Sequence, residues 1–445
     1  MLSYPVRIAL IAALGGFLFG FETVVISGAE KTLQNIWKLS SITQGFTVAS
    51  SLLGTIFGSM VASIPAKKFG RKKVLQVIAV LFIIAAIGCA SVSEWALFIF
   101  FRIIGGIAVG ASSMVAPMYI SEIAPAKLRG RLAGSFQVNI VLGIMVAFLT
   151  NFLLKDLGDN AWRWMFGIML VPAVLFWVLL RTIPESPRWL VLNGLAEQAV
   201  PVMQKLGEPD VQGAVAAIRL SMHEQGGADG RHKEPLFQKR YSKPIVYAML
   251  LAMFNQLSGI NAILYYAPRI FEMAGFDKND SFLQSVYVGA ANLFFTLLAM
   301  TVIDKFGRKK LLLIGSIGMT IFLGLTARAF GEHTSANGMV LAYLIGFIAF
   351  FAFSQGAVIW VFISEIFPNS VRSQGGSLGS STHWIMAAII SWTFPVIVEG
   401  SRDGGYYSFI FYSIMMFIQL IFVWRVLPET KGRTLEDIQK DLGIA

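Results

Sequence analysis

The stretch KFGRKK, residues 68–73, lies between two long apolar runs and returns unchanged at residues 305–310, again between two apolar runs. Repeats spaced by about 240 residues predict that the chain consists of two homologous halves. Three other features repeat in the same order: SEIAP at 121–125 returns as SEIFP at 364–368, Arg129 as Arg372, and Pro184 with Glu185 as Pro428 with Glu429.

The composition indicates a membrane protein. Of the 445 residues, 56% are hydrophobic and 14% are charged, whereas about 25% of the residues in a soluble domain are charged. Twelve apolar segments have about the length that a helix needs to cross a bilayer. We therefore expect an all-α membrane protein with twelve transmembrane helices, the first of which is retained because no cleavage site follows it. The segments lie near 5–28, 43–65, 74–92, 95–118, 131–154, 162–181, 243–271, 282–303, 310–330, 338–363, 376–398 and 404–427.

The positive charge is concentrated in alternate connections between these segments. AKKFGRKK at 66–73, PAKLRGRL at 125–132 and DKFGRKK at 304–310 are basic, whereas SVSEW at 91–95 has no basic residue. This alternation follows the positive-inside rule, so the net charge of +11 sets the topology and does not indicate nucleic-acid binding. We expect a multi-pass protein of the plasma (cell inner) membrane, surrounded by the lipid bilayer, with both termini in the cytoplasm.

One long polar stretch divides the segments into six and six. We expect an N-terminal six-helix bundle over residues 1–182, a cytoplasmic linker over 183–240, and a C-terminal six-helix bundle with a short tail over 241–445. Within the linker, residues 195–207 and 211–224 are typical of short amphipathic helices at the membrane surface. Two repeated halves place a substrate site at their interface near the bilayer midplane.

An acid, Glu22, interrupts the first apolar segment. An ionised carboxylate within the bilayer costs on the order of 2.5–3.5 kcal/mol unless it is paired, so we expect a cationic partner. Glu22 lies about 24 Å along the helix from Val6, and Arg102 lies about 10 Å from Trp95 at the outer end of the fourth segment. Both residues then lie in the outer part of the membrane, which predicts that they pair.

The seventh segment carries the amides of NQLSGINAILYY, residues 255–266. On a straight helix, Gln256 and Asn261 would point about 140° apart. An interruption at Gly259 would let both side chains face one cavity. Amides donate and accept hydrogen bonds, which suits a neutral ligand rich in hydroxyl groups. The other interpretation is that these amides only bind neighbouring helices.

Several motifs together resemble the sugar porter family of the major facilitator superfamily, over about residues 8 to 438. The resemblance implies the major facilitator fold and sugar transport by alternating access. The motifs are GGFLFGFETVVISGA at 15–29, RIIGGIAVGASSMVAPMYISEIAPAKLRGRL at 102–132, PESPRWL at 184–190, QLSGINAILYYAP at 256–268, NLFFTLLAMTVIDKFGRKK at 292–310, VFISEIFPNSVRS at 361–373 and PETKGRTLED at 428–437.

The resemblance also implies two sets of functional residues. The sugar site would comprise Gln137, Asn255, Gln256, Asn261, Asn292, Trp360, His383 and Trp384, with Phe19 and Tyr265 as further candidates. A cytoplasmic gate of inter-helix salt bridges, which ties the halves shut when the site faces outward, would comprise Arg71, Glu122, Arg129, Glu185, Asp304, Arg308, Glu365, Arg372 and Glu429.

Three positions depart from the family pattern. Lys67 replaces an acid in the first basic loop, which should loosen one corner of the gate. Glu22 stands where proton-coupled members usually carry Asp and passive facilitators a neutral residue. His383 stands where relatives more often have Gln or Asn. Its functional interpretation is an altered sugar selectivity or a pH-sensitive contact, and its structural interpretation is a buried histidine that forms a hydrogen bond with a neighbouring helix. His223, His232 and His333 show no metal-ligand spacing.

The sequence therefore predicts a proton-coupled symporter that imports a monosaccharide, either a hexose or a pentose. In this hypothesis Glu22 binds an external proton, which frees Arg102 and permits closure around the sugar. A passive sugar uniporter with a static Glu22–Arg102 pair is the alternative, followed by an inositol or polyol transporter and by a sugar sensor that does not transport. No nucleophile–base set, nucleotide loop or metal cluster indicates an enzyme or a cofactor, and we expect a monomer.

Overall fold

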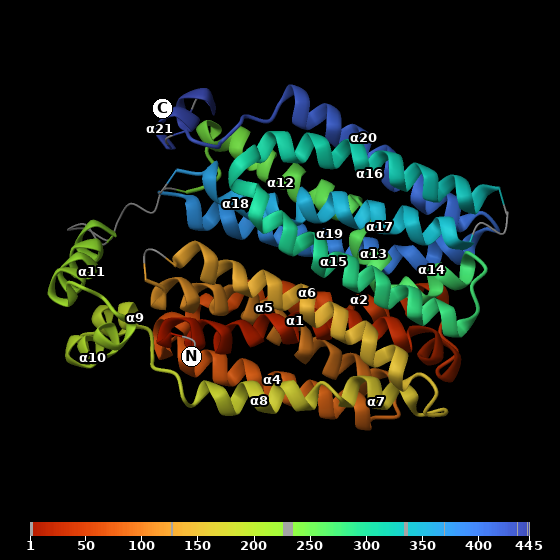
Figure 1. Cartoon of the computed structure of the whole chain (residues 1–445), viewed down its shortest axis with the longest axis horizontal. Coiled ribbons are helices and arrows are strands. Elements are labelled where there is room, and N and C mark those ends of the chain that lie inside the picture. Colours follow the sequence, from red (N-terminus) through yellow and green to blue (C-terminus); the bar gives the residue numbers. More distant parts are fainter. Residues whose placement is uncertain are drawn as a thin grey trace. The chain divides into compact units, whose positions relative to one another are not determined.

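The computed structural model describes residues 3–125, 128–225, 235–332, 337–368, 370–433, 435–442 and 444, with the backbone only at 221–225, 302–305, 337, 364, 435 and 436. Helices make up almost all of this part of the chain (Figure 1). The first eleven α-helices are α1 (Tyr4–Ile36), α2 (Ser41–Val61), α3 (Ser63–Phe69), α4 (Arg71–Ser91), α5 (Trp95–Ile123), α6 (Arg129–Leu154), α7 (Ala161–Gly167), α8 (Leu170–Leu180), α9 (Pro187–Leu192), α10 (Ala196–Leu206) and α11 (Val211–Gln225). After the 3-10 helix η1 (Lys239–Tyr241) follow α12 (Ser242–Leu257), α13 (Ile260–Tyr265), α14 (Ala267–Met273), α15 (Lys278–Phe306), α16 (Arg308–Gly331), α17 (Asn337–Phe353), α18 (Gln355–Glu365), α19 (Arg372–Gly400), α20 (Gly404–Arg425) and α21 (Leu435–Leu442).

The number of spans agrees with the sequence. Among the described residues, eleven helical stretches are long and apolar enough to cross a membrane. The pair α2 and α3, bent by 45°, makes a twelfth. Each predicted apolar segment overlaps one of these stretches, so the prediction of an all-α protein with twelve transmembrane helices is confirmed.

The seventh span is broken at the glycine that the sequence singled out. Gly259 separates α12 from α13 and has a φ of +81°, in the left-handed region that favours glycine. A Cβ atom at this position would also meet the ring of Tyr412. The helix is therefore interrupted between Gln256 and Asn261, within a single candidate span over Lys239–Tyr265.

The chain folds into two compact units. Four of the five boundaries fall inside α1, α2, α6 and α7, so the end of α1 and the start of α2 belong to the second unit. The predicted division into bundles at 182 and 240 follows the sequence repeat and not these two compact units, and it stays a prediction. The first unit comprises Met1–Glu22, Gly54–Gly143 and Phe166–Lys233, and the second comprises Thr23–Leu53, Ile144–Met165 and Glu234–Ala445.

Within the first unit, α4 packs against α5 and α8. The rings of Phe98 and Phe166 meet edge to face, with their centroids 5.3 Å apart. The short helices α9, α10 and α11 pack on one another through a small apolar cluster of their own, which includes Leu190, Met203 and Val215. Helices α10 and α11 cover the two stretches predicted as short amphipathic helices.

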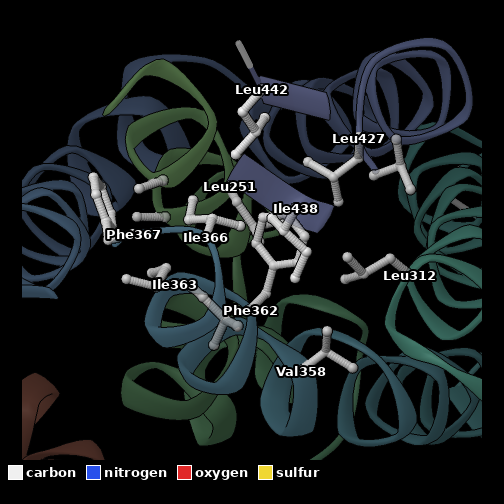
Figure 2. Close-up of a cluster of buried hydrophobic side chains, with 14 of the residues drawn as sticks. Leu251, Leu312, Val358, Phe362, Ile363, Ile366, Phe367, Leu427, Ile438 and Leu442 are labelled. Carbon is white, nitrogen blue, oxygen red and sulfur yellow. The ribbon is translucent and has the colours of Figure 1, made fainter. Parts of the chain in front are cut away.

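Within the second unit, α16 runs alongside α20, and α12 packs against α19 (Figure 1). One end of this unit is filled by a cluster of buried apolar side chains from α12, α16, α18, α20 and α21 (Figure 2). Ile438 and Leu442 of α21 point into this cluster towards Phe362 and Leu251 (Figure 2). The C-terminal helix therefore belongs to the hydrophobic core of the second unit.

Candidate functional site

Glu22 and Arg102 form an ion pair within the first unit. Arg102 Nη1 donates to Glu22 Oε1 and, at 3.3 Å, to the backbone oxygen of Glu22. Both side chains are only 1% exposed. Glu22 lies on α1 and Arg102 on α5, and their contact agrees with the pairing predicted from their similar depths in the membrane.

The surroundings of the ion pair are closely packed. A Cβ atom on Gly105 would lie 2.7 Å from Glu22 Oε1, so only glycine leaves room for the carboxylate here. The Arg102 guanidinium also lies over the ring of Phe166, 5.6 Å from its centroid, which is a cation–π distance. Glu22 Oε2 and Arg102 Nε have no hydrogen-bond partner among the described residues. One carboxylate oxygen is thus open to bind a proton.

The amides of the seventh span form a connected chain of hydrogen bonds in the second unit. Asn261 Nδ2 donates to Gln256 Oε1 at 2.9 Å, across the break at Gly259. Gln256 Nε2 donates in turn to Asn255 Oδ1 at 2.9 Å. The break therefore brings Gln256 and Asn261 together, as the sequence predicted it would.

His383 of α19 extends this chain of amides. Its Nε2 atom lies 3.2 Å from Gln256 Nε2. Because an amide nitrogen can only donate, the ring nitrogen that receives this hydrogen bond carries no proton. The imidazole also contacts two indoles, with centroid distances of 4.9 Å to Trp360 and 4.8 Å to Trp384. His383 thus joins the amides to the aromatic side chains of the predicted sugar site.

Gln355, the first residue of α18, is a member of this network that sequence analysis missed. Its Oε1 atom accepts a hydrogen bond of 3.3 Å from Asn255 Nδ2. The side chain is fully buried, and its Nε2 donor has no partner among the described residues. An unpaired buried donor is costly, which marks a position where a polar ligand or water is expected. The one available signal was a glutamine within an apolar span.

The other predicted sugar-site residues are distributed over both units. Gln137 on α6 and Phe19 on α1 belong to the first unit and are half-buried. Asn292 on α15 and Tyr265 at the end of α13 belong to the second unit and are buried. Each unit therefore supplies some of the predicted binding residues.

The predicted gate residues of the first unit form what we call the Arg71 cluster. Arg71 binds Glu122 through Nε and Nη2, at 2.9 and 2.8 Å. Glu185 accepts hydrogen bonds from the backbone nitrogens of Arg71, Lys72 and Ser186, at 2.8 to 3.1 Å. Among the described residues, Glu185 pairs with no arginine side chain, contrary to the salt bridge that the family resemblance implied. It caps the N-terminus of α4 instead, where the helix dipole favours an anion.

The Arg308 cluster in the second unit repeats this arrangement. Arg308 Nη2 donates to Glu365 at 3.1 Å, and Glu429 accepts from the backbone nitrogens of Arg308 and Lys309 at 3.0 and 3.1 Å. Glycines precede both capped helices: a Cβ atom on Gly70 would collide with Glu185, and one on Gly307 would lie 2.8 Å from Glu429. The sequence repeat is therefore also a repeat of contacts.

The remaining predicted gate residues are Arg129, Arg372 and Asp304, and the first two line pockets beside the two clusters. Arg129 is exposed and lines a pocket together with Glu122. Arg372 lines another pocket with Arg308 and Glu365, and donates to the backbone oxygen of Phe367 at 3.4 Å. The side chain of Asp304 lies outside the described residues, as do His232, His333 and the side chain of His223.

The sequence is similar to a family model and to known proteins over almost its whole length. Residues 8–442 match the model of a family described as "Sugar (and other) transporter". The chain belongs to this family. Proteins similar to this chain include the D-xylose-proton symporter of Escherichia coli K12, 37% identical over 98% of this chain and 95% of that protein. The arabinose-proton symporter of Bacillus subtilis is 35% identical (99% and 95% covered), and the glucose transport protein of Synechocystis is 39% identical (98% and 97%).

Solved structures give the same fold. The inward-open conformation of the xylose transporter XylE from E. coli matches with a TM-score of 0.87 and 36% identity, covering 98% of this chain and 99% of that one. The proton:xylose symporter bound to 6-bromo-6-deoxy-D-glucose matches with a TM-score of 0.81, 36% identity and 99% coverage of both chains. The protein is thus a multi-pass membrane transporter with the major facilitator fold.

Proposed function

We propose that this protein is a proton-coupled symporter that imports a monosaccharide, a hexose or a pentose, by alternating access. The relatives named as proton symporters of xylose and arabinose support this proposal. The observation that carries it is the buried Glu22–Arg102 pair, in which one carboxylate oxygen is unpartnered.

In the proposed cycle, Glu22 binds the transported proton. While Glu22 is ionised, the charges of Glu22 and Arg102 compensate each other at a place that excludes water. A proton on Oε2 removes the negative charge and leaves Arg102 buried without a counter-ion, which is strongly unfavourable. A rearrangement of α1 and α5 then lowers the free energy of the protein, and this links proton binding to the conformational change.

The amide chain of the second unit would bind the sugar. Gln256, Asn261 and Asn255 offer donors and acceptors that match sugar hydroxyl groups. Trp384 and the partly exposed Trp360 offer aromatic faces for the apolar side of a sugar ring. We assign Gln137, Phe19, Asn292 and Tyr265 to the same site on the family pattern.

We also propose that the protein is a monomer. Its two termini would lie in the cytoplasm, because the basic connections then lie on the inner side of the membrane. The Arg71 and Arg308 clusters belong to that side. They would act together as the cytoplasmic gate, in which each cluster is formed by residues of a single sequence repeat.

The test is uptake of labelled xylose, arabinose and glucose into proteoliposomes, with and without an imposed inward proton gradient. The wild type is expected to accumulate at least one sugar above the external concentration only when the gradient is present. Glu22→Gln should lose accumulation but retain sugar exchange at equal concentrations, because exchange needs no net proton movement. Accumulation by Glu22→Gln would contradict the proton role of Glu22.

Passive facilitation is the second candidate, and one contact favours it. Arg102 also donates to the backbone oxygen of Glu22, a bond that protonation of the carboxylate would leave intact and that suits a static pair. In that case wild type and Glu22→Gln would both equilibrate sugar, and the proton gradient would change neither. Glu22→Asp serves as the charge-preserving control.

A further inference from the structure

A second group of charges gathers at the other end of the spans, away from the basic connections. Arg269 on α14 donates from Nη1 to Glu30 Oε2 on α1 at 3.3 Å, and from Nη2 to Glu399 Oε1 on α19. The side chain of Glu30 is 2% exposed, that of Arg269 12% and that of Glu399 29%. One guanidinium thus bridges two carboxylates from different helices.

Three neutral side chains complete this group. Gln34 accepts from Arg269 at 3.3 Å and donates to Glu399 at 2.9 Å. Ser41 donates to Glu399, and Gln44 donates to Glu30 Oε2 at 2.7 Å. We call these six residues, Glu30, Gln34, Ser41, Gln44, Arg269 and Glu399, the outer ion cluster. All of them lie in the second compact unit.

The contacts of this cluster cross the sequence repeat, whereas those of the Arg71 and Arg308 clusters do not. Helices α1 and α2 come from the first repeat, and α14 and α19 from the second. Arg269 with Glu30, Arg269 with Gln34, Gln34 with Glu399, and Ser41 with Glu399 all join one repeat to the other. Lys31 of α1 also pairs with Glu272 of α14.

The helices are in direct contact just below the cluster. Trp392 Nε1 of α19 donates to the backbone oxygen of Ile42 in α2 at 2.9 Å. A Cβ atom on Gly45 would collide with the backbone oxygen of Trp392, so the two helices touch here. The outer ion cluster therefore lies over a closed seam between α2 and α19.

A pocket adjoins the cluster. A pocket of about 590 Å³ is lined by Glu30, Lys31, Arg269 and Glu272, among other residues. The Arg269–Glu399 and Lys31–Glu272 pairs include partly exposed side chains. Ion pairs that water can reach are weak and break readily, which suits contacts that must open in every cycle.

We propose that the outer ion cluster is a latch that holds the outer side of the transporter closed, with Arg269 as the residue that connects its two acids. This inference rests on the proposed function, since a latch has a role only in a protein that alternates. To open outward, α1 and α2 must leave α14 and α19, so Arg269 must release Glu30 and Gln34. Glu30, almost fully buried, then needs water or a proton in place of the guanidinium.

The test follows the opening of the seam with a cysteine reporter. Ala49 follows Ser41 and Gly45 at intervals of four residues on α2, so it lies on the same face, and it is fully buried. The reporter variant Ala49→Cys is made in a Cys89→Ser background, because Cys89 is the single native cysteine. A membrane-impermeant maleimide added from outside should label Cys at 49 slowly, and only when the seam opens.

Removal of the latch should raise the labelling rate by about fivefold or more, since a lost ion pair shifts the balance between closed and open states. Arg269→Gln and Glu399→Gln should both show this increase. Arg269→Gln leaves Glu30 buried and unpaired, so the double variant Glu30→Gln with Arg269→Gln tests the same contact without an isolated charge. Arg269→Lys should label at an intermediate rate, because an ammonium group does not reproduce the guanidinium fork.

Arg328→Gln is the matched control, because the Arg328–Glu332 pair lies four residues apart at the end of α16 and spans no seam. Labelling of the control at the wild-type rate and faster labelling of the latch variants supports the proposal. Wild-type labelling rates in Glu399→Gln and in the double variant would overturn it. The readout needs no sugar, so a protein that transports none of the tested sugars but responds to latch removal would refute the proposed substrate and not the latch.

Discussion

Asn261 and Gln256 are joined by a hydrogen bond of 2.9 Å across a break in the seventh span. The break depends on Gly259, whose φ of +81° disfavours any residue with a Cβ atom. Glycine at this place thus determines the geometry of the candidate sugar site.

Gly259→Ala should weaken sugar binding. The left-handed conformation costs an alanine about 1–2 kcal/mol, and its methyl group would collide with Tyr412. We expect a KM for uptake raised by about tenfold or a loss of uptake, together with a lower thermal midpoint in detergent. Gly376→Ala is the control, since a Cβ atom there meets no other atom within 4 Å. An unchanged KM in Gly259→Ala would contradict the role of the break.

Gln355→Met should raise the KM for sugar with little change in the maximal rate. The substitution keeps the length of the side chain but removes the acceptor for Asn255 Nδ2, and a hydrogen bond of this kind is worth about 1 kcal/mol, or roughly fivefold in affinity. The matched control is Gln419→Met, because Gln419 is equally buried but donates to Ser316, away from the amides. Equal kinetic effects of both substitutions would show that Gln355 has no particular role in the site.

Glu185→Ala and Glu429→Ala should destabilise the protein to a similar extent. Each removes a carboxylate that caps a helix by accepting backbone hydrogen bonds, and loss of a cap costs about 0.5–2 kcal/mol. Thermal unfolding in detergent measures the effect, with the exposed Glu208→Ala as control. A large loss in one variant and none in the other would mean that the two clusters are not equivalent.

Leu442→Ala or Ile438→Ala should also lower stability, because both side chains are 3% exposed in the core cluster of Figure 2. Truncation of a buried aliphatic side chain costs about 2–5 kcal/mol in a well-packed core, and we expect the lower end at the terminal helix α21. Lys440→Ala on the exposed face of the same helix is the control. Equal thermal midpoints for Leu442→Ala and Lys440→Ala would show that α21 does not contribute to the core.

The features predicted from the sequence are those that depend on position along one helix. Apolar length predicted the twelve spans, a glycine between two amides predicted the break at Gly259, and depth in the membrane predicted the pairing of Glu22 with Arg102. Each argument needs only the rise and periodicity of a helix.

The features that were missed depend on which faces of separate helices meet. Gln355 lies beside Asn255, and Glu185 binds backbone nitrogens of α4, because of packing that spacing does not reveal. The same holds for Arg269, whose partners Glu30 and Glu399 lie 239 and 130 positions away in the chain.

Gln256 has its oxygen bound to Asn261 and its nitrogen bound to Asn255 and His383. A sugar hydroxyl that accepts a hydrogen bond from the nitrogen of this amide must therefore displace a bond that the protein already makes, whereas a hydroxyl that donates can use the second lone pair of the oxygen. At the nitrogen, binding becomes an exchange of partners, and a sugar that lacks the hydroxyl group there leaves the original bond in place instead of stranding a buried group. This nitrogen therefore discriminates weakly between sugars that differ only in the hydroxyl group that it would bind.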